Sequence, residues 1–350
     1  MPLHSEGRAL TVTWAARNPH LEGSSMESQI KLSKGVQELL RCPICKTRLN
    51  MMPDHLVCLN SKCGVQFPLI DGVPVLLNEQ ASLFSIDDFV SRRSTTVNLR
   101  GSRIKKTLQR LIPSSSANIK GESNYATFAS LLTSQVSTPR ILIIGGRILG
   151  QGMNSLVSNS SLELVETDVS FGPRTMLICD AHDIPFEDGS FNGVVAQAVL
   201  DDLVDPQRCV EEIHRVLKTH GLVYAETPFM QQVHGGRYDF TRFTHLGHRR
   251  LFRRFDEIDS GAVCGPGMAL AWSYEHFLLS FTRTRALRDL IKAFARLTSF
   301  YLIFFDNYLI DKAGTLDAAS GVYFMGRKEN HILSDRELIR LYRGAADPEN

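Results

Sequence analysis

The sequence predicts an α/β protein built on a doubly wound, mostly parallel sheet, with a small N-terminal zinc ribbon and a helical insertion. Three observations support this fold class. Four cysteines fall within 22 residues near the N-terminus. From Arg140 onward, short runs of β-forming residues alternate with helix-length segments, as in parallel sheets that carry helices on both faces. Residues 266–310 then have the pattern of long amphipathic helices.

Composition places the chain among ordinary globular proteins. Its 350 residues are 43% hydrophobic and 22% charged, enough for two or three folding units. The net charge of +2 argues against a globally basic nucleic-acid binder and against an acidic disordered chain, while a local basic patch stays open. The longest apolar run, Phe300–Phe305, is too short to span a bilayer, and the N-terminus lacks the apolar core of a signal peptide. We therefore expect a cytoplasmic protein without a transmembrane segment.

The chain divides into five predicted units. The first has no apolar periodicity, and Met26 within it is an alternative start. The units are a flexible leader over 1–35, the zinc ribbon over 36–78, a helical linker over 79–138, an α/β domain over 139–330 with the helical insertion at about 261–320, and a C-terminal helix or tail over 331–350.

The cysteine cluster predicts a structural zinc site. Cys42-Pro-Ile-Cys45 and Cys58-Leu-Asn-Ser-Lys-Cys63 form two turns separated by 12 residues, and each turn brings two thiolates to one tetrahedral ion. Four thiolates leave no open coordination position, so the site is expected to be structural and not catalytic. A redox CxxC would not need the second pair, whereas four coincidental buried cysteines are the plain alternative. The odd total of seven cysteines argues against a disulfide framework.

The residues around the cluster also match a known module. The four cysteines, Pro43 and the closing Asp71-Gly72-Val73-Pro74-Val75-Leu76 resemble small zinc ribbons at the N-terminus of some methyltransferases. They are also similar to short free-standing proteins that activate tRNA and protein methyltransferases. The resemblance implies a zinc-ribbon fold for this unit.

Five strands and one helix stand out in the α/β domain. The helix Pro206–Leu217 begins with proline, carries Val210, Ile213 and Val216 on one face, and stops before Gly221. A late strand is expected at Gly321–Arg327. The five candidate strands are Ile141–Ile144, Leu162–Val165, Thr175–Cys179, Val194–Ala196 and Leu222–Ala225.

A glycine-rich turn follows the first of these strands. Gly145, Gly146 and Gly150 permit positive φ angles and let a ligand approach the backbone. Asp168 follows Gly145 by 23 residues, at the end of the next strand, where a carboxylate can accept both hydroxyls of a ribose. The turn and Asp168 together predict a nucleotide-type site. A tight structural turn and a helix-capping Asp168 are the alternatives.

The stretch after the third strand narrows the choice of nucleotide. Cys179-Asp180-Ala181-His182-Asp183-Ile184-Pro185-Phe186, followed by Glu212-Ile213-His214-Arg215-Val216-Leu217-Lys218, strongly resembles class I S-adenosylmethionine-dependent methyltransferases of the type 11-like group. The likeness spans residues 139–260 and implies a Rossmann-like fold with S-adenosyl-L-methionine as cofactor. It also implies that Asp180 accepts from the adenine amino group, that the Ala181 amide contacts the ring, and that Gln197 borders the donor pocket. A turn-capping Asp180 and a strand-end Gln197 are the alternatives.

Three positions depart from the family pattern. Arg147 stands where a glycine is common, and Ile143 replaces an acidic residue often found in the first strand. Asp201-Asp202 replaces the Glu-His often seen after the fourth strand, which leaves the role of that position open. The first two departures favour a non-catalytic scaffold as an alternative to an enzyme.

An acceptor site is expected after the fifth strand. The stretch Pro228–Thr244 mixes His, Tyr, Asp and Arg around two glycines, and open α/β sheets bind ligands at this edge. It resembles a stretch in methyltransferases of surface-glycan and secondary-metabolite pathways. His234 and Asp239 are the candidate catalytic residues, because a hydroxyl or amine acceptor needs a general base. A hydrogen-bonded structural loop is the alternative.

The insertion is rich in aromatic and basic residues. An acceptor pocket or lid, an ordinary core stripe, and a peripheral membrane contact are three interpretations of it. The basic residues of the linker are expected to form a solvated face. The aromatic residues are Phe277, Phe281, Phe294, Phe300, Tyr301, Phe304, Phe305 and Tyr308; the basic ones of the insertion are Arg283, Arg285, Arg288, Lys292 and Arg296, and those of the linker are Arg100, Arg103, Lys105, Lys106 and Arg110.

The leading hypothesis is a methyltransferase that uses S-adenosyl-L-methionine and a structural zinc. Its methyl acceptor is unidentified, with a glycan, a lipid-linked compound or a small molecule as the candidates. The alternatives are an RNA methyltransferase, against which the near-neutral charge argues because phosphate contacts need clustered basic residues, and the non-catalytic scaffold. Neither the acceptor nor the oligomeric state follows from the sequence.

Overall fold

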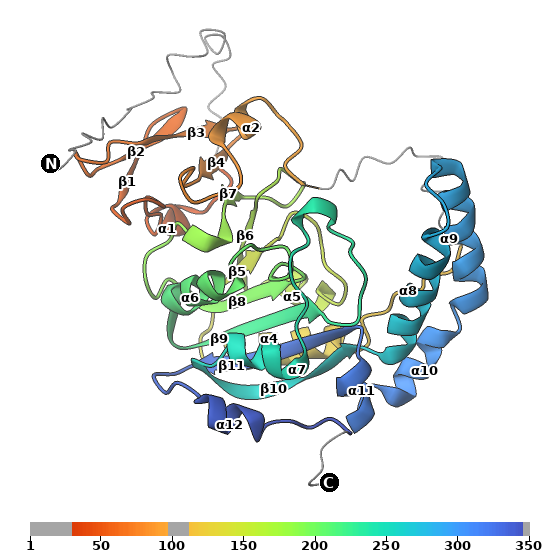
Figure 1. The fold of residues 1–350 in the computed structure, drawn as a ribbon. Helices are drawn as coiled ribbons and strands as arrows, with labels where there is room; N and C mark the ends of the chain where they lie inside the picture. The colour runs from red at the N-terminus through yellow and green to blue at the C-terminus, as the bar shows by residue number, and fades with distance from the viewer. Residues whose placement is uncertain (1–29, 97–111, 346–350) are drawn as a thin grey trace, which may run out of the picture.

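The computed structural model describes residues 30–96 and 112–345. Within them, the strands form one eleven-stranded sheet in the order β1-β2-β3-β4-β7-β6-β5-β8-β9-β11-β10, with helices on both faces (Figure 1). The expectations for the leader at 1–29, for Met26 and for the five basic linker residues at 100–110 lie outside the described residues.

The middle of the sheet is parallel, as the sequence predicted. Its strands are β7 (Leu177–Cys179), β6 (Glu163–Asp168), β5 (Arg140–Ile144), β8 (Phe191–Gln197) and β9 (Leu217–Pro228). The chain reverses direction next to β9, where β11 (Gly321–Lys328) pairs antiparallel with it and β10 (Phe255–Cys264) forms the outer edge. The predicted α/β fold class is confirmed. The strand β10 was not predicted.

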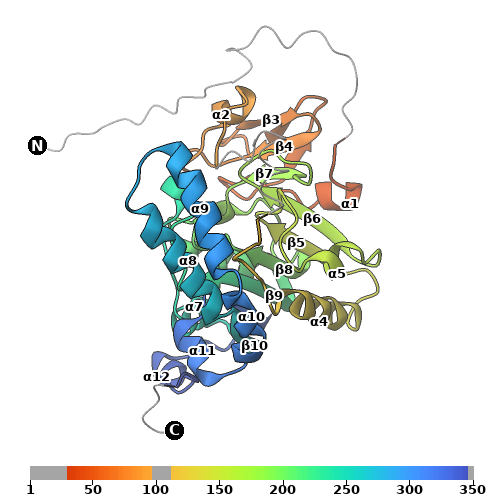
Figure 2. The same ribbon diagram turned by 90° about the vertical axis from the view of Figure 1, so that its right-hand side faces the viewer.

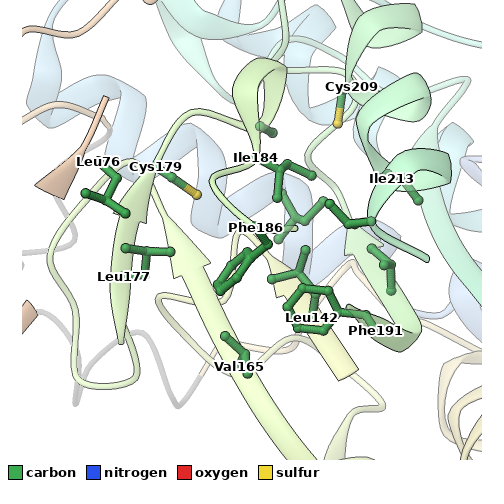
Figure 3. Packing of buried hydrophobic residues seen from close by; sticks show 14 of the residues in the cluster. Leu76, Leu142, Val165, Leu177, Cys179, Ile184, Phe186, Phe191, Cys209 and Ile213 are labelled. Carbon is green, nitrogen blue, oxygen red and sulfur yellow. The ribbon is translucent and has the colours of Figure 1, made fainter. Parts of the chain in front are cut away.

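Alternating residues of the central strands pack against helices on opposite faces. On one face Ile141 and Val195 share a buried cluster with Tyr125 and Phe128 of α4 (Gly121–Thr133). On the other face Leu142 shares a larger cluster with residues of α6 (Pro206–Val216), as Figure 3 shows around Phe186 and Phe191. The predicted helix at 206–217 therefore exists, and it ends one residue earlier because Leu217 begins β9.

The N-terminal unit is continuous with this sheet. It contains α1 (Lys34–Gln37), β1 (Leu49–Met51), β2 (His55–Cys58), β3 (Gln66–Ile70) and β4 (Val73–Leu76). The strand β4 pairs parallel with β7 through Val75↔Ile178 and Leu76↔Cys179. Residues of the ribbon and of the central strands also belong to one buried cluster. The ribbon therefore extends the sheet as its edge.

Residues 77–96, which we name the crossing segment, leave β4 at the carboxyl ends of the parallel strands. The segment includes α2 (Ile86–Val90), which begins with a capping box: the Ser85 hydroxyl accepts from the amide of Asp88, and the Asp88 carboxylate accepts from the amide of Ser85. Ile86 and Phe89 are buried in the large cluster. The crossing segment is therefore packed against the sheet domain.

Two short helices, α5 (Asn154–Val157) and η3 (Ala181–Asp183), lie between the parallel strands in the chain, and the remaining helices follow β9. The short helices α7 (His245–Leu251) and α12 (Asp335–Ile339) lie near β10 and β11, and η4 (Gly236–Tyr238) lies in the loop after β9. Four helices connect β10 to β11 and project to one side of the sheet, as both views show (Figures 1 and 2). They are α8 (Pro266–Leu279), α9 (Arg285–Ser299), α10 (Leu302–Leu309) and α11 (Ala313–Ala318). Among the residues that the structure describes, no helix has both the length and the apolar character needed to cross a membrane.

Candidate active site and zinc centre

The four ribbon cysteines converge as the sequence predicted. The Sγ atoms of Cys42 and Cys63 lie 3.9 Å apart and those of Cys45 and Cys58 lie 3.3 Å apart, and all four lie within 4.8 Å of one another. Zn–S bonds of about 2.3 Å in a tetrahedron place sulfur atoms about 3.8 Å apart. Burial raises the pKa of the Cys42 thiol, so a cation is needed to hold this thiolate. The donor set fits a closed structural zinc site.

The glycine turn after β5 has the backbone conformation that requires glycine. Gly145 has φ +75°, and a Cβ there would overlap Cγ2 of Val199. The amide of Gly146 donates to the carbonyl of Thr167 at 2.9 Å, which ties the turn to β6. A Cβ on Gly150 would overlap the side-chain amide of Gln197. The predicted glycines and Gln197 therefore lie side by side at the carboxyl ends of β5 and β8.

Asp168 is the last residue of β6, next to this turn. Its Oδ2 accepts from the amide of Arg147 at 3.1 Å. Burial raises the pKa of Asp168 to about 6, although the Arg147 guanidinium opposes this shift. The side chain of Arg147 leads away to Thr96, to whose Oγ1 it donates at 2.9 Å. Arg147 therefore fixes Asp168 through its backbone and anchors the crossing segment through its side chain.

Asp180 follows β7 and is already hydrogen-bonded. Its Oδ1 accepts from the amide of His182 at 3.0 Å and lies 2.6 Å from Nδ1 of the same residue, while Oδ2 accepts from Ser82 Oγ at 2.6 Å. Burial opposes ionisation, but the hydrogen bonds from His182 and Ser82 lower the pKa of Asp180 below its usual value. Ala181 is buried beside it. An adenine amino group at Asp180 would share or displace the Ser82 hydroxyl.

The crossing segment contacts the donor-side edge at several points that sequence reasoning missed. Asn78 Nδ2 donates to Asp183 Oδ2 at 3.1 Å, and Thr95 Oγ1 donates to the carbonyl of Val169 at 2.6 Å. The guanidinium of Arg92 lies 4.7 Å from the ring centroid of Phe171. No motif marks these residues, because their role depends on the docking of β4 beside β7.

A buried polar network lies beneath Gln197 and was also missed. Glu226 at the end of β9 accepts from Tyr224 Oη at 2.6 Å, from Gln197 Nε2 at 2.8 Å and from Asn118 Nδ2 at 2.9 Å. Burial raises the pKa of Glu226. Glu226 and Tyr224 lie two positions apart on β9, as residues on one face of any strand do. The sequence therefore gives no separate signal for this network.

His234 and Asp239 are brought together in the loop after β9. Asp239 Oδ2 accepts from the amides of His234 at 2.8 Å and Gly235 at 3.2 Å, and it also accepts from Arg242 at 2.9 Å. Despite its burial, these contacts lower the pKa of Asp239 to about 2. A carboxylate this acidic is a weak base, so its contacts orient the loop. The His234 ring lies with Nδ1 3.7 Å from Asp239 and Nε2 3.7 Å from Asp201.

A hollow of about 450 Å³ lies beside this loop. Its wall comes from the loop and from Ser273 of α8, to whose hydroxyl Gln232 donates at 3.0 Å. The insertion therefore borders the hollow. The lining residues are Phe229, Met230, Gln231, Gln232, Val233, Asp239, Phe240, Thr241, Arg242 and Ser273.

The aromatic residues of the insertion are mostly exposed, which contradicts their interpretation as core. Phe281 is 75% exposed, Tyr308 71% and Phe277 63%. Inward contacts come from small residues, with Ala271 and Ala295 fully buried, and the 3.1 Å ion pair between Arg296 of α9 and Glu275 of α8 joins two helices of the insertion. The helices of the insertion thus pack on one another on one side and present apolar side chains on the other.

Comparison with known proteins gives matches in both units. A family profile described as "Methyltransferase domain" matches residues 153–225. In its N-terminal region the chain is 35% identical over 51 residues to a UPF0434 protein of Ectopseudomonas mendocina, which covers 15% of this chain and 84% of that protein.

Solved structures also align with the chain. Phosphoethanolamine N-methyltransferase 2 of Haemonchus contortus, in complex with S-adenosyl-L-methionine, aligns over 61% of this chain and 54% of its own, with 14% identity and a TM-score of 0.39. A chain from the complex between the Haloferax volcanii Trm112 methyltransferase activator and a methyltransferase aligns over 59% of this chain and 91% of its own, with 17% identity and a TM-score of 0.35.

Proposed function

We propose that this member of the class I S-adenosylmethionine-dependent methyltransferases methylates an oxygen or nitrogen atom of an acceptor bound in the hollow beside the loop after β9. Its N-terminal segment belongs to the UPF0434 family. The observation that carries the proposal is the shared edge of the sheet. The donor-side residues stand at the carboxyl ends of β5 to β8, and the hollow adjoins the carboxyl end of β9.

Each donor-side residue is assigned a different part of the cofactor. Asp168 would accept from the ribose hydroxyls and Asp180, followed by Ala181, would face the adenine. Gly145, Gly146 and Gly150 would let the backbone approach the donor, with Gln197 closing the pocket. The cofactor supplies a methyl group on a positively charged sulfur, so the protein has mainly to align the two reactants.

On the acceptor side we assign different roles to the two candidate residues. His234 is the group that can take the proton from a hydroxyl or amine, because Nδ1 lies 3.2 Å from the carbonyl of Gln232. A proton on Nδ1 leaves Nε2, which lies 3.7 Å from Asp201, as the proton-accepting nitrogen. Asp239 is a positioning residue, since Arg242 and two backbone amides already bind it. Loss of a general base typically costs about 10²- to 10⁴-fold in rate.

The test measures donor affinity and turnover in the same variants. We expect His234→Asn to lower turnover with donor affinity unchanged, whereas His220→Asn, a change in an exposed histidine paired with Glu329 at 2.9 Å, leaves both unchanged. The acceptor would be supplied as cell extract divided into RNA, glycan, lipid and small-molecule fractions. Donor binding without turnover in every fraction would favour the non-catalytic scaffold, and turnover only with the RNA fraction would favour the RNA alternative.

Among acceptors we propose a lipid-linked one, presented at an anionic membrane surface. The support is the insertion face, defined here as the exposed apolar residues of α8 to α10 and the turns between them: Leu270, Phe277, Phe281, Leu287, Leu290, Phe294, Leu297, Tyr301, Phe304, Phe305 and Tyr308. So large an apolar surface marks an interaction site. Exposed Arg283 and Arg285 lie among these residues, and a mixed apolar and basic face suits anionic lipid. The proposed location stays cytoplasmic, where the ribbon thiols remain reduced.

Vesicle sedimentation tests this assignment. We expect binding to phosphatidylglycerol-containing vesicles that falls with salt and is weakened in Leu290→Glu. Ile339→Glu is the matched control, because Ile339 on α12 is 67% exposed but lies outside the insertion face. Absence of vesicle binding would exclude the lipid-linked assignment. A dimer that Leu290→Glu dissociates, without vesicle binding, would assign the face to a second copy of the chain.

A further inference from the structure

Three carboxylates gather beside the proposed acceptor hollow. Asp201 and Asp202 follow the carboxyl end of β8, and Asp239 follows η4 in the loop after β9. One oxygen of each lies within 4.8 Å of the others. The family likeness assigns none of the three to donor binding.

Asp201 lacks the contacts that a buried carboxyl needs. Its side chain is fully buried, yet neither of its oxygens has a hydrogen-bond partner within the described part of the chain, and Oδ1 of Asp202 is also without one. The nearest cationic candidate is His234 Nε2 at 3.7 Å, which is beyond hydrogen-bond distance. Buried polar groups in native proteins are almost always satisfied, so something further is expected here.

Protonation satisfies at most one oxygen of this group. A protonated carboxyl has one O–H, for which the nearby acceptors are the carboxylate oxygens of Asp202 and Asp239 within 4.8 Å, and its other oxygen still lacks a hydrogen-bond donor among the described residues. The charge balance also favours a cation. Three ionised carboxylates carry −3, and Arg242, which pairs with Asp239, contributes +1, so negative charge remains in excess whichever protonation state His234 has. A divalent ion would offset this excess.

The backbone holds the carboxylates in place before any ligand arrives. The carbonyl of Asp201 accepts from the amides of Phe240 at 2.9 Å and Thr241 at 3.1 Å, which ties the two loops together. Gly235 approaches Asp202 so closely that a Cβ would overlap its Oδ1. The ligand set thus comes from two strand ends fixed to one another.

We propose that Asp201, Asp202 and Asp239 bind one divalent cation of the oxygen-preferring class, Mg²⁺ or Mn²⁺, separate from the ribbon zinc. Carboxylate oxygens are the ligands these ions prefer, whereas the four thiolates of the ribbon select zinc. Oxygen atoms on opposite sides of an octahedral Mg²⁺ are about 4.2 Å apart, which the cluster reaches with small side-chain movements. The cation site adjoins the hollow because Asp239 lines it.

Titration of the zinc-loaded full chain with MnCl₂, followed by electron paramagnetic resonance of free Mn²⁺, tests the proposal. We expect one Mn²⁺ per chain, displaced by excess Mg²⁺. Asp201→Asn keeps the shape and removes the charge, and it should weaken Mn²⁺ binding at least about tenfold. Asp256→Asn, a change in an exposed carboxylate on β10, is the matched control and should bind Mn²⁺ like the wild type.

Melting temperature supplies a second measurement that does not depend on activity. Mn²⁺ should raise it in the wild type and in Asp256→Asn, but not in Asp201→Asn. If Asp201→Asn does not fold, Asp202→Asn takes its place in both measurements. Equal Mn²⁺ binding by the wild type and the folded cluster variant, or no stoichiometric binding at all, would overturn the proposal. The result is independent of whether the chain methylates the expected acceptor.

Discussion

If Asp168 holds the donor ribose, donor affinity must depend on pH in a defined way. Burial raises the pKa of this carboxyl to about 6, from an unperturbed value of about 3.9. The ionised form accepts hydrogen bonds from two hydroxyls, whereas the protonated form has lost acceptor capacity. Affinity should therefore be full at pH 7.5 and fall as the pH drops through 6.

The size of the effect follows from the same number. With a pKa of about 6, only about one-tenth of the Asp168 side chains are ionised at pH 5, so the dissociation constant should rise about tenfold between pH 7.5 and pH 5. Asp168→Asn loses hydrogen bonds to a charged acceptor, worth about 1.5–3 kcal/mol, which corresponds to about 10- to 150-fold weaker binding at pH 7.5.

Isothermal titration with S-adenosylhomocysteine at both pH values provides the assay. The ratio of the two dissociation constants in Asp168→Asn measures the contribution of all other groups, and it should be clearly smaller than the ratio in the wild type. Asp256→Asn controls for the loss of a surface charge. Equal ratios in the wild type and in Asp168→Asn would refute the assignment of the ribose to this carboxylate.

Three further outcomes are expected. Joint replacement of Cys42 and Cys45 by serine should abolish zinc binding, since structural zinc contributes about 10–16 kcal/mol to such modules, and one retained zinc per chain in elemental analysis would contradict the site. Burial lowers the pKa of His248 to about 3, below the unfolded value of about 6.5, so the unfolded chain takes up the proton first. The free energy of unfolding should then be at its full value above pH 6.5 and decline as the pH falls toward 3. In urea unfolding, His248→Leu should reduce the slope of this free energy against pH by up to about 1.4 kcal/mol per pH unit. Gly145→Ala should cost about 1–3 kcal/mol because of its positive φ and the contact with Val199, and an unchanged unfolding midpoint would argue against a constrained turn.

The central strands and the zinc ligands could be predicted from the sequence because each depends on a pattern of residues close together in the chain. Runs such as Ile141–Ile144 are buried on both faces and therefore lack polar interruptions, and cysteine spacing directly reflects a turn around an ion. By contrast, β10 was missed because it is an edge strand, paired with β11 alone among the described strands, and its sequence lacks the period-two alternation of a half-buried strand. Register shifts between Glu257 and Asp259 and between Ala262 and Cys264 interrupt that alternation.

The parts of the site that were missed all depend on contacts between distant segments. Ser82 reaches Asp180 across 98 positions, and the carboxylate of Asp201 is left without a hydrogen-bond partner among the described residues only when the loops after β8 and β9 meet. The sequence did identify His234 and Asp239 as neighbours in a polar loop. It gave no sign that Arg242 holds Asp239 ionised, which changes the role that we assign to this residue.

The docking of β4 beside β7 affects how the protein is made. Leu76 pairs with Cys179, 103 positions later in the chain, and synthesis proceeds at about 5–20 residues per second. The ribbon therefore waits for roughly 5–20 seconds on the ribosome with its docking edge uncovered. An uncovered edge is a template for pairing with other chains, and Pro74 within β4 offers no amide hydrogen to such a partner. The newly made wild-type ribbon should therefore aggregate less than the Pro74→Ala variant before β7 is synthesised. A translation assay that scores aggregated nascent chains can measure the difference.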